Sequence, residues 1–298
     1  MNPLRLLPRA GTAAVLVLAL GCGGGGGSSE LVINEQNAAA LAASGVGAVS
    51  MLEGMSEMVD GMSEVFNPAA QVMPCDSGNV TLNIQDMGTQ GLSTGDYASL
   101  DFNGCVLDFG DGALTFNGMF YLRAEDVTGD PLSGPFTRSF YADYGALTAT
   151  IFGVTMVIDG GLTASLSSPD GVTLVADVSG GRFSAFAQAG GSVFSGSLND
   201  FRCERTLDTA TGAYSVDFEA TIYSNELAGS AHFETTVPFT GMGEDHPSAG
   251  TFVATGAEGA TATLVALDSV NVQILVDADG DGVNETTINT TWDALENS

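Results

Sequence analysis

The sequence predicts an all-β protein, an antiparallel meander forming a barrel or sandwich of about fifteen short strands, preceded by a short helical segment. From Asn79 onward, apolar and polar residues alternate with a period of two in segments rich in Thr, Val, Phe and Tyr. Short turns containing Gly, Asp, Asn or Pro separate these segments. No helical pattern lies between them, whereas parallel β-α-β topology needs crossover helices.

The first element, residues 1–21, has the pattern of a lipoprotein signal peptide. Arg5 and Arg9 precede an apolar run from Gly11 to Leu20, which is shorter than the roughly 20 residues that a spanning helix needs. The run ends in LALGC, which resembles the bacterial lipobox, although Ala19 stands where leucine is usual. The resemblance implies that Cys22 is lipidated and becomes the first mature residue.

Residues 22–30 form the second element, a tether. Gly23 to Ser29 reads GGGGGSS, a flexible coil with an end-to-end distance on the order of 15 Å. Such slack is useful between a membrane anchor and a folded domain. In lipoproteins of this type an aspartate after the cysteine holds the protein in the inner membrane. Because Gly23 occupies that place, the resemblance implies the outer membrane, with the membrane as partner through the lipid on Cys22.

The third element is a helical segment, residues 31–68, expected to pack on the sheet. Asn34 is the predicted cap, and the glycines of residues 44–47 predict a weakened or broken helix. Ser50-Met-Leu-Glu53 has capping-box spacing for a second helix, and Pro68 predicts its end.

Methionines recur on one face of this segment at intervals of four, three and four residues: Met51, Met55, Met58 and Met62. Copper(I) ligation is disfavoured because the segment lacks histidine and cysteine. The pattern favours an apolar face packed against the sheet. A deformable groove for apolar ligands is the alternative.

The fourth element, residues 69–298, is the β-domain. Its expected strands begin with NVTLNI (79–84) and YASLDF (97–102) and end with VNVQILV (270–276) and ETTINTTW (285–292). Glycines divide TRSFYADY from the segment that starts at Gly145, and VTLVADV from GRFSAFA. A transmembrane barrel is disfavoured, because the chain has one Trp and six Tyr and ends in DALENS rather than on an aromatic residue.

Three cysteines remain after Cys22, and the oxidising cell envelope favours a disulfide. A Cys75–Cys105 bridge would pin the linker after the helical segment to the sheet and contribute on the order of 3 kcal/mol. Cys203 is then unpaired, either buried or available to another molecule. Spacing alone leaves a bridge from Cys203 to either of the others open.

The stretch VDADGDGVNE (276–285) places acidic residues at calcium-loop spacing between two expected strands. An EF-hand is disfavoured, because its flanks would be helices and its twelfth residue a glutamate, where this chain has Ile288. The loop resembles instead the strand–loop–strand calcium hairpins of integrin-type propeller repeats. That resemblance implies Ca²⁺ ligands at Asp277, Asp279, Asp281, Glu285 and the carbonyl of Val283. The alternative is an acidic hairpin turn without an ion.

The composition excludes some partners and favours a saline habitat. The chain has no lysine and a formal net charge of −29, and removing residues 1–21 with Arg5 and Arg9 leaves 5 − 36 = −31. Such a surface repels nucleic acid. Its self-repulsion destabilises a compact state unless salt or bound cations screen it.

The sequence carries no convincing catalytic motif. GLSTG (91–95) fits G-x-S-x-G, but a further strand rather than a helix follows it. His232 and His246 stand without a motif around them. We therefore expect a non-catalytic protein.

The layout as a whole resembles uncharacterised acidic lipoproteins of marine or salt-adapted Gram-negative bacteria. The resemblance rests on the lipobox with its glycine tether, the block between Cys75 and Cys105, and the tail from Pro247 through DADGDG to Trp292. It implies an envelope protein with a structural or binding β-domain whose partner the sequence does not specify. The alternative is a carrier of an apolar ligand, a lipid or acyl chain, inside a curved sheet plugged by the Met-lined helix.

Overall fold

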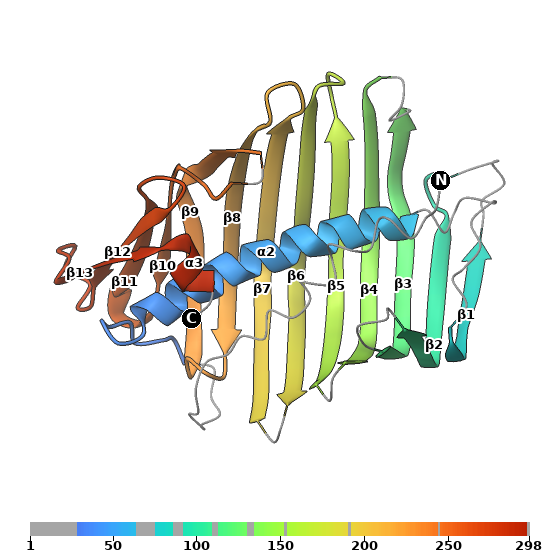
Figure 1. Ribbon diagram of the computed structural model, residues 1–298, viewed down its shortest axis with the longest axis horizontal. Helices are drawn as coiled ribbons and strands as arrows, with labels where there is room; N and C mark the ends of the chain where they lie inside the picture. Colours follow the sequence, from blue (N-terminus) through green and yellow to red (C-terminus); the bar gives the residue numbers. More distant parts are fainter. Residues whose placement is uncertain are drawn as a thin grey trace.

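A computed structural model describes residues 29–63, 75–85, 92–108, 113–129, 134–151, 154–189, 192–243 and 245–296. These residues form one antiparallel sheet of thirteen strands, β1 to β13, in which each strand pairs with its neighbours in the chain (Figure 1). A long helix, α2, crosses one face of the sheet. The predicted all-β antiparallel meander with an N-terminal helix is confirmed.

The elements follow one another in a simple order. They are α2 (Ala38–Ser63), β1 (Ser77–Gln85), β2 (Tyr97–Asp108), β3 (Ala113–Gly129), β4 (Phe136–Ile151), β5 (Val154–Ser168), β6 (Thr173–Ala189), β7 (Ser192–Asp208), β8 (Ala213–Ser224), β9 (Gly229–Met242), β10 (Ala249–Thr255), η3 (Ala257–Gly259), β11 (Thr261–Ala266), β12 (Asn271–Asp277), β13 (Thr286–Thr291) and α3 (Trp292–Glu296).

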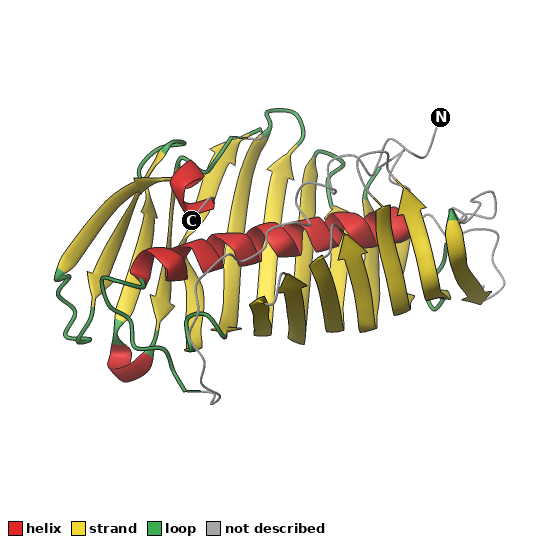
Figure 2. Cartoon of the chain, turned by 60° about the horizontal axis from the view of Figure 1, so that its bottom comes forward, coloured by secondary structure: helices red, strands yellow, loops and turns green. Residues whose placement is uncertain are grey.

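The sheet is open rather than closed. In the pairing of the described residues β1 and β13 are its two edges, so neither a barrel nor a sandwich is confirmed. Figure 2 shows the sheet curving around α2, and we call the face that packs on the helix the concave face. The opposite, convex face is rich in polar side chains, as the alternating burial of β8 illustrates.

Several strands are longer than predicted, because glycines expected to end them lie inside them. Gly145 lies within the 16-residue β4, and Gly180 within the 17-residue β6. The pairing shifts register between Tyr144 and Leu147, and again between Gly161 and Thr163. These glycines therefore accompany irregularities that bend long strands, and they do not mark turns.

The predicted break in the helical segment is wrong, because α2 is one continuous helix. Gly45 is accommodated by packing: a Cβ atom there would lie 2.9 Å from the rings of both Phe233 and Phe252. Ser50 does not cap a second helix, and its hydroxyl donates to the carbonyl of Val46. The cap at Asn34 is confirmed, since its Oδ1 accepts from the amides of Gln36 and Asn37.

The core lies between α2 and the concave face. Leu41, Leu52 and Met55 of the helix are buried there, together with sheet residues such as Phe120 and Phe183. The window Ala38–Met55 is long and apolar enough to cross a membrane, but half of it is buried in this core. Burial against the sheet explains its apolar composition.

Both ends of the described chain are fixed to the sheet. Before α2, the Leu31 amide donates to the carbonyl of Ser230, and the Ala257 amide donates to the carbonyl of Leu31. After β13, the indole of Trp292 is buried and donates to the carbonyl of Pro247. The two hydrogen bonds of Leu31 therefore hold the chain just before α2 beside β9 and next to the residues that precede β11.

Candidate functional site

The acidic loop joins β12 to β13, as the strand–loop–strand prediction requires. One carboxylate oxygen from each of Asp277, Asp279, Asp281 and Glu285 lies within 4.8 Å of the others. Asp277 is buried and the other three side chains are exposed. Oxygen donors at this separation suit a hard cation such as Ca²⁺.

Backbone amides of the loop already donate hydrogen bonds to carboxylates of this cluster. Asp277 accepts from the amides of Gly280 and Gly282, both at 2.8 Å, and Glu285 accepts from Ala278 at 2.7 Å. The Val283 amide donates to Asp281, and the ligand role of the Val283 carbonyl remains a prediction. The loop is thus an ordered acidic hairpin by itself, and Ca²⁺ binding remains a prediction as well.

A second cluster, which the sequence did not reveal, surrounds His246. Its Nε2 lies 3.6 Å from Oδ1 of Asp293, and its Nδ1 lies 3.6 Å from Oε1 of Glu296. The imidazole stacks on the indole of Trp292, with ring centroids 5.8 Å apart. These contacts hold α3 against the loop before β10. The only available sequence signal was the i, i+3 spacing of the two carboxylates.

The other catalytic candidates lie apart from this cluster. His232 is on β9, with Nε2 3.9 Å from Oε1 of Glu219 on the neighbouring strand. Ser93 lies in a turn, where its amide and hydroxyl both donate to Asp96, and β2 follows at Tyr97. The turn predicted for GLSTG is therefore confirmed for its described residues.

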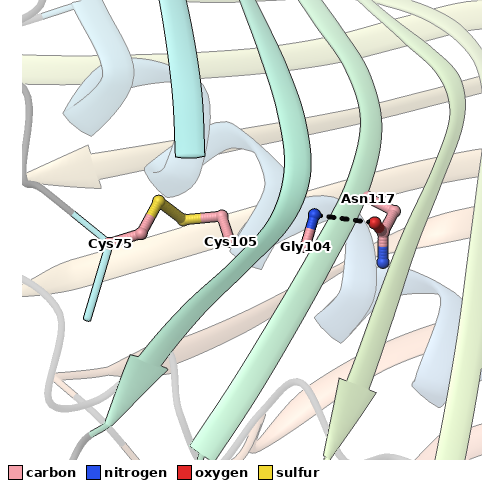
Figure 3. Close-up of a disulfide and its surroundings, with 4 residues drawn as sticks. All are labelled: Cys75, Gly104, Cys105 and Asn117. Carbon is pink, nitrogen blue, oxygen red and sulfur yellow. Dashed lines mark hydrogen bonds between the residues drawn. A yellow bond between two sulfur atoms is a disulfide. The ribbon is translucent and has the colours of Figure 1, made fainter. Parts of the chain in front are cut away.

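The predicted disulfide is confirmed between Cys75 and Cys105, with a sulfur–sulfur distance of 2.02 Å (Figure 3). It ties the segment before β1 to β2, beside a hydrogen bond from the Gly104 amide to Asn117 on β3. Cys203 is free and buried on β7. Burial raises the pKa of its thiol to about 12, so this thiol stays neutral at physiological pH.

A partly exposed ion pair near Cys203 was also missed by sequence reasoning; the Arg205 and Glu53 side chains are 33% and 29% exposed. Arg205 of β7 points to the concave face, and its Nη1 lies 3.5 Å from Oε1 of Glu53 on α2. Its guanidinium stacks over the ring of Tyr214, 5.2 Å from the centroid. The Tyr214 hydroxyl in turn donates to the carbonyl of Asp245. Glu53, Arg205 and Tyr214 thus form a partly exposed polar cluster where α2 meets the concave face.

The methionine face agrees with packing where its side chains are described. Met55 is buried and Met51 is half-buried against the core. Met58 and Met62 lie on the last turns of α2, with side chains outside the described residues. The signal peptide, Cys22 and most of the tether also lie outside the described residues.

No protein-family model matches the sequence, and neither the curated proteins nor the solved structures contain a significant match to it. The site residues above therefore stand on their own geometry and chemistry.

Proposed function

We propose that this chain is a lipid-anchored protein of the outer membrane, with a non-catalytic β-domain that has a structural or binding role. The sequence around Cys22 supports the anchor, because a lipobox followed by a glycine tether precedes the first described residue, Ser29. At the end of the tether, the Ser230 amide donates to the carbonyl of Ser29 and the Leu31 amide donates to the carbonyl of Ser230, which joins this part of the chain to the sheet.

The observation that supports a binding role is the open, acidic convex face of the sheet. Its core is filled by α2 along the concave face, which leaves the convex face for contact with partners. Acidic residues of three adjacent strands, Asp177, Glu204 and Asp217, pair in one cross-strand row on that face. A face of this kind suits cationic partners and disfavours nucleic acid.

The anchor is tested by metabolic labelling with an alkyne fatty acid in a Gram-negative host, followed by membrane fractionation. We expect the wild-type chain to be labelled and to sediment with the outer membrane. A Cys22→Ser variant should lose the label, whereas Cys203→Ser should keep it. Equal labelling of the Cys22→Ser variant would contradict the anchor.

A second candidate function is carriage of an apolar ligand, a lipid or acyl chain, on the concave face, and the curvature of the sheet around α2 supports it. In a carrier, α2 would be the plug and the trough beneath it the ligand site.

A further inference from the structure

Three of the six tyrosines in the chain lie on adjacent strands of the convex face. Tyr97 is on β2, Tyr121 on β3 and Tyr141 on β4, and each is half-buried. The residue that follows each tyrosine is buried in the core on the opposite face: Ala98, Leu122 and Ala142. Because successive side chains of a strand point to opposite faces, the tyrosines point away from α2, which Figure 2 shows inside the curve of the sheet. We call these three residues the tyrosine patch.

The tyrosine patch surrounds one arginine. The register pairs Arg123 of β3 with Tyr97 on one side and with Tyr141 on the other. The guanidinium of Arg123 lies 5.7 Å from the ring centroid of Tyr141, within the range of a cation–π contact. In the next row, the ring centroid of Tyr121 lies 5.8 Å from that of Tyr97, and the two ring planes are tilted by 35°. The four side chains thus form one continuous surface that spans two strand spacings, roughly 10 Å.

A glycine lets the ring of Tyr141 lie close to the sheet. A Cβ atom on Gly161 of β5 would lie 3.0 Å from Cζ of Tyr141, so a larger residue at this position would push the ring away. The ring of Tyr141 therefore leans toward β5 and forms a low base for the guanidinium of Arg123.

Hydrogen-bonding groups lie around the rings. Nε and Nη2 of Arg123 donate to Oε1 of Glu125, at 2.8 and 2.5 Å, and the two side chains are 48% and 38% exposed. A guanidinium has five N–H groups, so donors remain beyond the two that bind Glu125. In its own row, Tyr121 is flanked by Ser99 and Asp143. The tyrosine patch therefore combines an aromatic surface with donors and acceptors at its rim.

We propose that the tyrosine patch binds a neutral polysaccharide, with sugar rings stacked on Tyr97 and Tyr121 and sugar hydroxyls hydrogen-bonded to Arg123. The inference rests on the binding role proposed above for the convex face and names its partner. The faces of tyrosine rings offer flat apolar area to the C–H groups of a sugar ring. Sugar hydroxyls both donate and accept hydrogen bonds, and the guanidinium and the carboxylates around the rings supply both kinds of partner.

Other classes of ligand fit the tyrosine patch less well. An anionic ligand is repelled by the formal net charge of −29, and the arginine of the patch is already paired with Glu125. A cationic ligand would meet Arg123 at the centre of the patch. A protein partner would need about 800 Å² of surface on each side, which would extend beyond the patch onto acidic residues such as the exposed Asp101. A single polysaccharide chain is narrower and needs only the strip that the rings provide.

The test is affinity electrophoresis of the purified full chain in native gels that contain a neutral soluble polysaccharide: hydroxyethylcellulose, laminarin, galactomannan or dextran. We expect at least one of them to retard the wild-type chain relative to a gel without polysaccharide. Tyr97→Ala and Tyr121→Ala should each weaken this binding about fivefold or more, because a stacking surface is lost. Tyr97→Phe keeps the ring and should retain most of the affinity. Tyr223→Ala removes a half-buried tyrosine from the convex face of β8, and as the matched control it should leave the affinity unchanged.

Thermal melts of every variant check that it is folded. Arg123→Gln leaves the three rings in place and should also weaken the binding, so it provides the test if a tyrosine variant fails to fold. Equal retardation of the Tyr97→Ala, Tyr121→Ala and Tyr223→Ala variants would show that the rings stabilise the sheet and do not bind sugar. Stronger retardation by alginate, an acidic polysaccharide, than by the neutral ones would also overturn the assignment.

A separate measurement distinguishes this inference from the binding role on which it rests. Hexalysine, a cationic peptide, is titrated into the chain by calorimetry, with Glu204→Gln as the variant that weakens the acidic row of β6 to β8. If hexalysine binds through this row and no polysaccharide retards the chain, the polysaccharide assignment is wrong while the binding role of the convex face stands. If neither binds, the binding role itself falls.

Discussion

At the scale of single residues, a missing side chain decides how closely α2 approaches the sheet. A methyl group on Gly45 would meet the rings of Phe233 and Phe252 at 2.9 Å, whereas a Cβ on Gly54, in the same helix, would have no atom within 4 Å. Both glycines carry the same intrinsic helix penalty, so a difference in stability between alanine substitutions at the two positions reports the effect of packing against the sheet.

We expect Gly45→Ala to lower the free energy of unfolding by about 1–2 kcal/mol, because the added methyl forces buried rings to shift. Gly54→Ala should raise it by about 0.4–1 kcal/mol through helix propensity and reduced flexibility of the unfolded chain. Urea denaturation of both variants measures the two changes. Equal effects of the same sign would show that Gly45 is not a packing position.

Residue patterns in the sequence predicted local features and missed long-range ones. The cap at Asn34 was predictable because capping acts between neighbouring residues. The bridge between Cys75 and Cys105 was predicted as well, although spacing alone left Cys203 open as a partner until the structure showed it free. The contact of Arg205 with Glu53 joins residues far apart in the chain. It depends on the curvature that brings β7 under α2, and no sequence period encodes that curvature.

At the scale of elements, hairpins are fixed by a recurring aspartate. Asp170, Asp208 and Asp268 each accept hydrogen bonds from the amides two and three residues later, at the β5–β6, β7–β8 and β11–β12 turns. The pKa of each carboxyl is lowered from its ordinary value, because these amide hydrogen bonds stabilise the carboxylate of Asp170 and of Asp208, and for Asp268 the side-chain amide of Asn271 adds the largest contribution to those of the backbone. The turn chemistry made such hairpins predictable, whereas glycines inside strands were misread because bulges and turns use the same residue.

The last hairpin, between β12 and β13, tests the calcium hypothesis. Four carboxylates within 4.8 Å repel one another, and a divalent cation relieves that repulsion. We expect Ca²⁺ at about 5 mM, above the dissociation constants of about 10⁻⁴–10⁻³ M found in extracellular modules, to raise the melting temperature.

Asp279→Ala should abolish this rise by removing one ligand. Asp170→Ala, in another hairpin, should retain it even if the variant starts from a lower melting temperature. Calorimetry with Ca²⁺ and with excess EDTA measures both variants. A wild-type melting temperature that does not respond to Ca²⁺ would mean that the amide hydrogen bonds of Asp277 and Glu285 suffice for the loop.

At the scale of the whole molecule, one open sheet presents a large acidic surface. The formal net charge is −29, and acidic rows such as Asp177, Glu204 and Asp217 pair across adjacent strands of the convex face. Like charges directly opposite each other on a sheet are destabilising. Arg202 offsets part of this row through its contacts with Asp177 and Glu204. The sequence predicted the charge, and the strand register shows where it concentrates.

Screening should therefore stabilise the fold. The Debye length falls from about 10 Å at 0.1 M salt to about 3 Å at 1 M, which is shorter than the spacing between adjacent strands. We expect the melting temperature in EDTA to rise by about 2–6 °C between 0.1 and 1 M NaCl, corresponding to about 1–2 kcal/mol for a chain of this size. Including EDTA removes any contribution of divalent cations at the β12–β13 loop.

The Arg202→Gln variant should have a lower melting temperature at 0.1 M NaCl than the wild type, and its melting temperature should rise more with salt. The reason is that the acidic row loses the cation that contacts Asp177 and Glu204. A melting temperature that falls steadily with NaCl would mean that the surviving ion pairs outweigh the repulsion and that the acidic surface needs no saline surroundings.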